Sequence, residues 1–213
     1  MKFKKDRLGT VFIITGILLL LCCIGLFVWN QILADRARED MDEQLDIVAA
    51  EIQKRQDPEK STENRTTESR TGKEIPVTEQ GHKSMPVVEK DGNDYIGYLS
   101  IPSVDLQIPV MNTYDDRKLE KAACRYYGSL ETEDMVLAGH NYRNTLGKLK
   151  SISLGDTVEF VNMNGEVYRY TVGELEVLKP EAVHEMVESK WELSIYTCTY
   201  LGSERFTVRC KSE

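Results

Sequence analysis

A cysteine and an arginine near the end of the sequence are spaced so that two neighbouring strands would bring them together. Cys198 ends the apolar run ELSIYTC, and Arg205 opens the run RFTVRC after a short loop that contains Gly202. If the two runs pair as antiparallel strands around the loop 200–203, Cys198 lies directly opposite Arg205. Opposed side chains have Cβ atoms about 4.5–5.5 Å apart, so the spacing predicts a thiol and a guanidinium in one small volume.

This pair has the properties of an acyl-transfer site. A thiol beside a fixed cation forms the nucleophilic thiolate more readily, and the cation can also stabilise the oxyanion that develops when sulfur attacks a carbonyl. Arg209 points to the same side of its strand but lies four residues farther along, roughly 13 Å at the rise of a strand. We therefore expect Arg205, and not Arg209, to serve Cys198.

Acyl transfer also needs a group that donates and accepts protons near neutral pH, which histidine does best. The sequence has three histidines. His82 lies in a polar segment and His184 in a short polar helix, whereas His140 ends the apolar run DMVLAGH where the chain enters a loop. Because catalytic groups are often displayed where a rigid strand meets a loop, we expect His140 to be the proton-transfer group.

The amino-terminal region predicts a membrane anchor. The run Val11–Trp29 is uncharged and 19 residues long, enough to cross about 30 Å of hydrocarbon as a helix. Residues 1–8 carry more lysine and arginine than acid, so the positive-inside rule places them in the cytoplasm and the rest of the chain outside the cell. The apolar core is longer than that of a typical signal peptide, which favours an uncleaved single-pass anchor over residues 9–30.

Two further segments separate this anchor from the folded domain. Apolar residues at spacings of three and four predict a juxtamembrane helix over 31–56, which serves either as a stalk or as a surface for self-association. Residues 57–91 are rich in Thr, Ser, Glu and Lys and poor in aromatics, which predicts a flexible linker. The net charge of −8 argues against binding to nucleic acid or to an anionic lipid surface.

The pattern changes again over residues 92–213, where short apolar or alternating runs are broken by turn residues. Several strands at this spacing predict an all-β barrel or sandwich. The sequence NMNG over 162–165 predicts a hairpin between two of them. Short helices are expected over 116–123, 144–149 and 180–187.

Three cysteines lie outside the apolar segment, so at least one has no partner within the chain. Cys210 alternates with Arg209 along its strand and is expected to face the core. A disulfide between Cys124 and Cys210 would leave Cys198 as the free thiol. A non-catalytic alternative is a membrane-tethered binding module in which Cys198 pairs with one of the other two. A zinc site ranks last, because the chain has no Cys-x-x-Cys or His-x-x-x-His pair.

The sequence from 95 to 210 resembles the sortases, membrane-anchored cysteine transpeptidases of Gram-positive bacteria. Three separated motifs in the family's order carry the resemblance: IGYLSIP with LQIPV, then LAGHN, then SIYTC followed by RFTV. The resemblance implies an eight-stranded sortase β-barrel with few helices, in which Cys198 is the nucleophile and His140 and Arg205 are its catalytic partners. SIYTC departs from the family's Thr-Leu-x-Thr-Cys at its first two positions.

By the same resemblance, the sulfur attacks an LPxTG-like sorting signal near the carboxyl end of a secreted protein. An amine of a peptidoglycan precursor or of a pilin then resolves the thioester. No cofactor or metal is expected. Asp57-Pro58 is followed by Glu59 and not by the aromatic residue of a pilus-type lid, so attachment of surface proteins to the cell wall is the default. The alternatives are a pilin-polymerising sortase and a thiol endopeptidase that uses water.

Overall fold

The computed structural model describes residues 3–56, 85–143, 145–199 and 202–213. The chain divides into two units, Met1–Glu39 and Asp40–Glu213, and helix α1 (Phe3–Gln56) contributes to both. Within α1 the stretch Gly9–Ile32 is long and apolar enough to cross a membrane, and none of its most apolar 18-residue window is buried.

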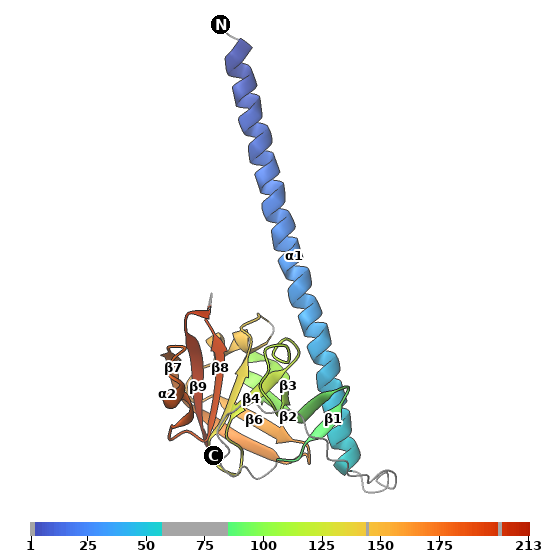
Figure 1. Cartoon of the computed structure of the whole chain (residues 1–213), viewed down its shortest axis with the longest axis vertical. Coiled ribbons are helices and arrows are strands. Elements are labelled where there is room, and N and C mark those ends of the chain that lie inside the picture. The colour runs from blue at the N-terminus through green and yellow to red at the C-terminus, as the bar shows by residue number, and fades with distance from the viewer. Residues whose placement is uncertain (1–2, 57–84, 144, 200–201) are drawn as a thin grey trace. The chain divides into compact units, whose positions relative to one another are not determined.

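The second unit is built on one sheet that closes into a barrel (Figure 1). Its strands are β1 (Val88–Lys90), β2 (Asn93–Ile101), β3 (Leu106–Met111), β4 (Ala123–Tyr127), β5 (Met135–Gly139), β6 (Thr157–Asn162), β7 (Val167–Leu178), β8 (Leu193–Cys198) and β9 (Arg205–Ser212). They follow the order β1-β2-β3-β4-β5-β8-β9-β7-β6, and β2 also pairs with β6. That last pairing closes the eight strands β2 to β9 into a barrel, which confirms the predicted fold class.

Most strand pairs are antiparallel, but β3 with β4 and β5 with β8 are parallel. The predicted hairpin joins β6 to β7, where Gly165 takes a φ of 78° that favours glycine. Residues 57–84 of the linker predicted over 57–91 lie outside the described residues. Within residues 85–91, Val88–Lys90 form β1.

The helical elements of the barrel unit are short: η2 (Pro102–Val104), η3 (Leu146–Ser151) and α2 (Val183–Val187). The helices predicted over 144–149 and 180–187 correspond to η3 and α2. The helix predicted over 116–123 is wrong, because this stretch forms turns and its last residue, Ala123, begins β4. A segment this short has too few i→i−4 bonds to propagate a helix when its end is drawn into a sheet.

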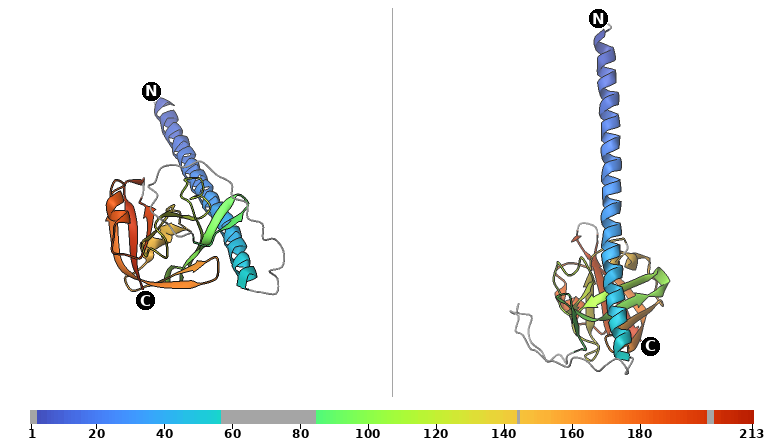
Figure 2. Two further views of the ribbon diagram at one scale, coloured as in Figure 1. Left: turned by 60° about the horizontal axis from the view of Figure 1, so that its bottom comes forward. Right: turned by 90° about the vertical axis from the view of Figure 1, so that its right-hand side faces the viewer.

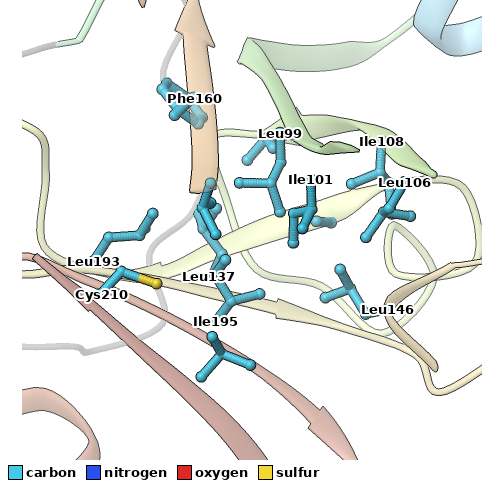
Figure 3. Close-up of a cluster of buried hydrophobic side chains, with 14 of the residues drawn as sticks. Leu99, Ile101, Leu106, Ile108, Leu137, Leu146, Phe160, Leu193, Ile195 and Cys210 are labelled. Atoms are coloured by element: carbon cyan, nitrogen blue, oxygen red, sulfur yellow. The ribbon is translucent and has the colours of Figure 1, made fainter. Parts of the chain in front are cut away.

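The interior of the barrel is a single apolar cluster (Figure 3). Alternate residues of each strand point into it, and Figure 3 shows Leu137 and Ile195 from β5 and β8 together with Cys210 from β9. Cys210 is fully buried among these side chains. The prediction that Cys210 faces the core is therefore confirmed.

A second apolar cluster covers part of the outer face of the barrel. Tyr196 of β8 belongs to it, as do Val48 and Ile52 from the last turns of α1. The Tyr95 hydroxyl also donates a hydrogen bond to Gln44 of that helix. The apolar stripe predicted along the juxtamembrane helix thus packs, over residues 40–56, against the domain itself.

Candidate active site

Strands β8 and β9 pair in the register predicted from the sequence, with Cys198 directly opposite Arg205. One position farther along, the N–H of Thr199 donates to the carbonyl of Glu204 at 2.9 Å. Hydrogen-bonded and non-hydrogen-bonded pairs alternate along an antiparallel ladder, so Cys198 and Arg205 form a pair of the second kind. The Cβ atoms are closest in such pairs, so the backbone pairing starts the two side chains next to each other on one face of the sheet.

The parallel pairing of β5 with β8 adds the histidine. Gly139 is the partner of Thr197, so the next residues, His140 and Cys198, leave their strands side by side. Cys198 shares the outer face with Tyr196, two residues earlier on β8, and His140 follows Ala138 of the same outer cluster at the same spacing, one residue past the end of β5. Neighbouring strands are about 4.8 Å apart, so the histidine, the cysteine and the arginine form a row across three adjacent strands.

Two hydrogen bonds hold the ends of β5 and β8 together on either side of this row. Before it, Thr197 Oγ1 donates to the carbonyl of Gly139 at 2.9 Å. After it, Asn141 Nδ2 donates to the carbonyl of Thr199 at 3.2 Å. His140 and Cys198 lie between these two side-chain-to-backbone bonds, which hold the two backbone segments together in addition to the pairing of β5 with β8.

Arg205 keeps its guanidinium available. In the part of the chain that the structure describes, Nη1 contacts only the carbonyls of Gly202 at 3.2 Å and Glu204 at 3.4 Å. Gly202 has a φ of 71°, a conformation that glycine adopts without strain and that the loop needs to turn. A half-buried arginine held only by two backbone carbonyls retains donors for a bound anion or carbonyl.

Three tyrosines form a wall beside the row, and the sequence analysis missed them. Tyr114 packs edge to face on Tyr126 with centroids 5.4 Å apart, and Tyr126 packs in the same way on Tyr196 at 5.6 Å. Burial, together with the Asp116 carboxylate, raises the pKa of Tyr114 to about 12. Tyr196, the last ring of this wall, lies two residues before Cys198 on the same strand.

The other candidates from the sequence lie elsewhere. His184 is on α2 with 76% of its side chain exposed and pairs with Glu188 at 3.3 Å. Arg209 is buried, 1% exposed, and forms an ion pair with Glu176. His82 lies outside the described residues. His140 and Arg205 are thus the histidine and the arginine whose backbone positions neighbour Cys198 in the described part of the sheet, and their roles stay predictions.

The cysteines are all free, which contradicts both disulfide alternatives. Cys124 and Cys210 are buried in separate clusters, one outside and one inside the barrel. Burial raises the pKa of Cys124 to about 11 and that of Cys210 to about 12, so both remain neutral thiols at ordinary pH. Cys198 is the one cysteine of the barrel unit that is partly exposed.

The comparisons with known proteins agree with this geometry. The family model of the sortase domain matches residues 99–213, more than half of the chain. The chain belongs to the sortase family. It is 28% identical over 127 residues to sortase A of Bacillus anthracis, with 55% of this chain and 60% of that protein covered. The chain therefore spans less than two thirds of the length of this relative.

Solved sortase structures share the fold. Sortase A from Corynebacterium diphtheriae superposes with a TM-score of 0.51 at 23% identity, covering 57% of this chain and 61% of that one. Sortase C1 from Streptococcus agalactiae gives the same TM-score and identity, covering 59% and 70%. At this level of identity the matches establish the barrel, and they include more than one sortase class.

The missed residues left no local signal in the sequence. Tyr114, Tyr126 and Tyr196 lie on separate elements, and only the closed barrel makes them neighbours. Asn141 does adjoin His140, so its link to the strand that bears the cysteine could have been guessed once the two strands were paired.

Proposed function

We propose that this protein is a cysteine transpeptidase that acts on secreted proteins with an LPxTG-like sorting signal. The observation that supports it most is the row of His140, Cys198 and Arg205 across three neighbouring strands of a sortase-family barrel. A nucleophile, a proton-transfer group and a fixed cation are the three components that acyl transfer through a thioester requires.

In the first half of the reaction, His140 takes the proton of the thiol, and Cys198 Sγ attacks a backbone carbonyl carbon of the signal. Arg205 donates hydrogen bonds to the oxyanion that forms. The C–N bond then breaks, the carboxyl-terminal fragment leaves as an amine with the proton from His140, and a thioester remains.

In the second half, an acceptor amine attacks the thioester carbon. His140 removes a proton from the arriving nitrogen, a new amide bond forms, and the C–S bond breaks to release the sulfur of Cys198. The proton returns to the thiol, so the site is regenerated without an external oxidant or reductant.

The proposal also covers the acceptor amine and the cellular location of the protein. We assign the acceptor to an amine of a peptidoglycan precursor, and a pilin lysine is the second choice. Residues 9–30 anchor the chain in the cell membrane with residues 1–8 in the cytoplasm, and the catalytic domain, residues 92–213, lies outside the cell. The helix Gly9–Ile32 supports the anchor by its length and composition.

Mass spectrometry of the full-length protein in detergent micelles tests the reaction. After incubation with an LPxTG peptide, the intact mass should rise by one acyl fragment, and Cys198→Ala should show no such adduct. Adding a glycine oligomer should yield an amide product. Formation of the free acid alone, with the amine present, would identify an endopeptidase instead. Absence of any adduct on the wild-type protein would refute the proposal for this peptide class.

A further inference from the structure

We propose that Arg209 is a positioning residue that fixes the segment between β7 and β8 as one wall of the peptide-binding site. By this proposal Arg209 sets the affinity for the substrate peptide and leaves the chemical step to Cys198, His140 and Arg205. The inference rests on the proposed function, because it concerns the peptide that the site would bind.

The Arg209 side chain is almost completely buried and its donors are used. Its hydrogen bonds run from Nη1 to the Met186 carbonyl (3.0 Å) and Ser194 Oγ (2.7 Å), from Nη2 to the Glu185 carbonyl (2.7 Å), and from Nε to Glu176 Oε1 (2.5 Å). Only a planar fork with several fixed donors can meet partners on α2, β7 and β8 at once. The guanidinium therefore ties three elements to β9.

The short helix α2 depends on this tie. It spans five residues, Val183–Val187, and so has few internal bonds of its own. The carbonyls of its last turn have no partners within the helix and need outside donors. Arg209 supplies donors to two of them, at Glu185 and Met186. Without the guanidinium the buried carbonyl of Met186 and the part-buried carbonyl of Glu185 both lose their partner, which favours displacement of the helix.

The segment held in this way borders the row of functional residues. It leaves β7 at Leu178, whose partner across the ladder is Arg205. It then crosses the outer face, where Met186 packs in the same cluster as Tyr196, two residues before Cys198. Figure 2 shows β7, β8 and β9, coloured orange to red, as neighbours on one side of the barrel. Movement of α2 would therefore reshape the surface next to the nucleophile.

Substrate kinetics of the full-length protein in detergent, with Arg209→Lys, test the proposal. Lysine keeps the positive charge beside Glu176 but loses the fork to the carbonyls. We expect KM for an LPxTG peptide to rise at least about fivefold and kcat to change less than about twofold. This is the pattern seen when a variant loses binding energy that the ground state and the transition state share equally. Amide hydrogen exchange over 179–192 should become faster.

Arg169→Lys is the matched control, since Arg169 lies on β7, is 57% exposed and pairs with Glu159 at 2.9 Å. It should leave KM and hydrogen exchange over 179–192 unchanged. If Arg209→Lys does not fold, Ser194→Ala removes one acceptor of the fork and should raise KM in the same direction by a smaller factor. A folded variant whose KM is unchanged, or whose kcat falls more than its KM rises, would overturn the proposal.

The two proposals can fail separately. A wild-type protein that forms no thioester with the peptide would refute the transpeptidase assignment. Hydrogen exchange over 179–192 needs no substrate, so it still decides whether Arg209 holds that segment. Unchanged hydrogen exchange in both Arg209→Lys and Ser194→Ala would overturn the proposal that Arg209 holds this segment, even if the enzyme is active.

Discussion

Each end of the β8–β9 ladder carries one cysteine and one arginine, and the two ends have opposite properties. At one end, Cys198 and Arg205 are directly opposed on the outer face and both are partly exposed. At the other end, Arg209 and Cys210 are consecutive, so they lie on opposite faces, and both are buried. The same two residue types form a candidate reactive site only where they share a face and keep access to solvent.

The comparison also separates reactivity from stability. Arg205 bonds to two carbonyls at the long end of the hydrogen-bond range, whereas Arg209 is bonded to groups on three elements. A guanidinium committed to the fold has no donors left for a ligand. The ladder therefore has one arginine with few bonds to the fold, which the proposed function assigns to the substrate, and one arginine whose donors are used by the fold.

The largest difference is expected between the two cysteines. Cys198→Ala should abolish thioester formation and turnover, because no other group can carry the acyl chain. Cys210→Ala should retain the thioester and most of the turnover, with a modest loss of stability from the missing sulfur. Intact mass and product analysis measure both. Loss of the thioester in folded Cys210→Ala would contradict the assignment of Cys198 as the nucleophile and Cys210 as a residue of the core.

The next largest effect is expected at Arg205. Arg205→Ala should lower kcat about 10²- to 10³-fold, the usual result of removing an oxyanion donor. Thermal unfolding should change little, because the side chain contacts only two backbone carbonyls in the described part of the chain. If Arg205→Ala and Arg209→Ala lower kcat equally, the distinction between the two arginines does not hold.

Arg209 should instead show its effect in stability. Arg209→Ala removes a buried cation, leaves Glu176 without its partner and exposes carbonyls of α2, which should cost about 3 kcal/mol of unfolding free energy. Circular dichroism of the full-length variants during heating measures this loss. A midpoint equal to that of Arg205→Ala would show that the buried end is no more important to the fold than the exposed one.

Alkaline pH should destabilise the fold through its buried thiols. Burial raises the pKa of Cys210 to about 12, while an exposed thiol titrates near 8.5. The unfolded chain therefore loses this proton before the folded protein does, so stability is complete below about pH 8.5 and falls as pH rises toward 12, by at most about 1.4 kcal/mol per pH unit. Cys210→Ala should show a shallower decline between pH 8 and 10.5, and an identical slope would contradict this cause.

The smallest effect is expected at His184, an exposed histidine on α2 to which we assign no part in the reaction. His184→Ala removes an exposed side chain and one surface pair, so turnover should change less than about twofold. His140→Ala should lower turnover by at least about 10². Steady-state rates of both variants decide the matter, and strong inactivation by the first would mean that the wrong imidazole was chosen.

The local part of this arrangement could be predicted from the sequence. Alternating apolar runs and a short loop determined the register of Cys198 with Arg205, because opposed positions in a hairpin follow from loop length. The end of the apolar run DMVLAGH indicated His140, the short strand-like runs predicted an all-β fold, and motif order narrowed that fold to a sortase-like barrel. These inferences concern residues close in sequence or positions that a family motif marks.

The long-range part could not be predicted. Arginine is seldom buried, so nothing in the sequence distinguished the buried Arg209 from the partly exposed Arg205 beyond the distance of Arg209 from the loop. The helix predicted over 116–123 overlapped the start of β4, because the pairing of β4 with β3 and β5, and not its local sequence, determines its conformation. The tyrosine wall likewise depends on the closure of the barrel.

The parallel pairing of β5 with β8 has a consequence for how the molecule matures. The bond from Thr197 to Gly139 joins positions 58 residues apart, with η3, β6, β7 and α2 between them. Contacts between distant parts of a chain form slowly, because the entropy of closing the loop is lost before the contact is gained. A chain that is being synthesised thus contains its imidazole, His140, before its sulfur, Cys198, and under the proposed function the two can act together only once the last strands have joined the sheet.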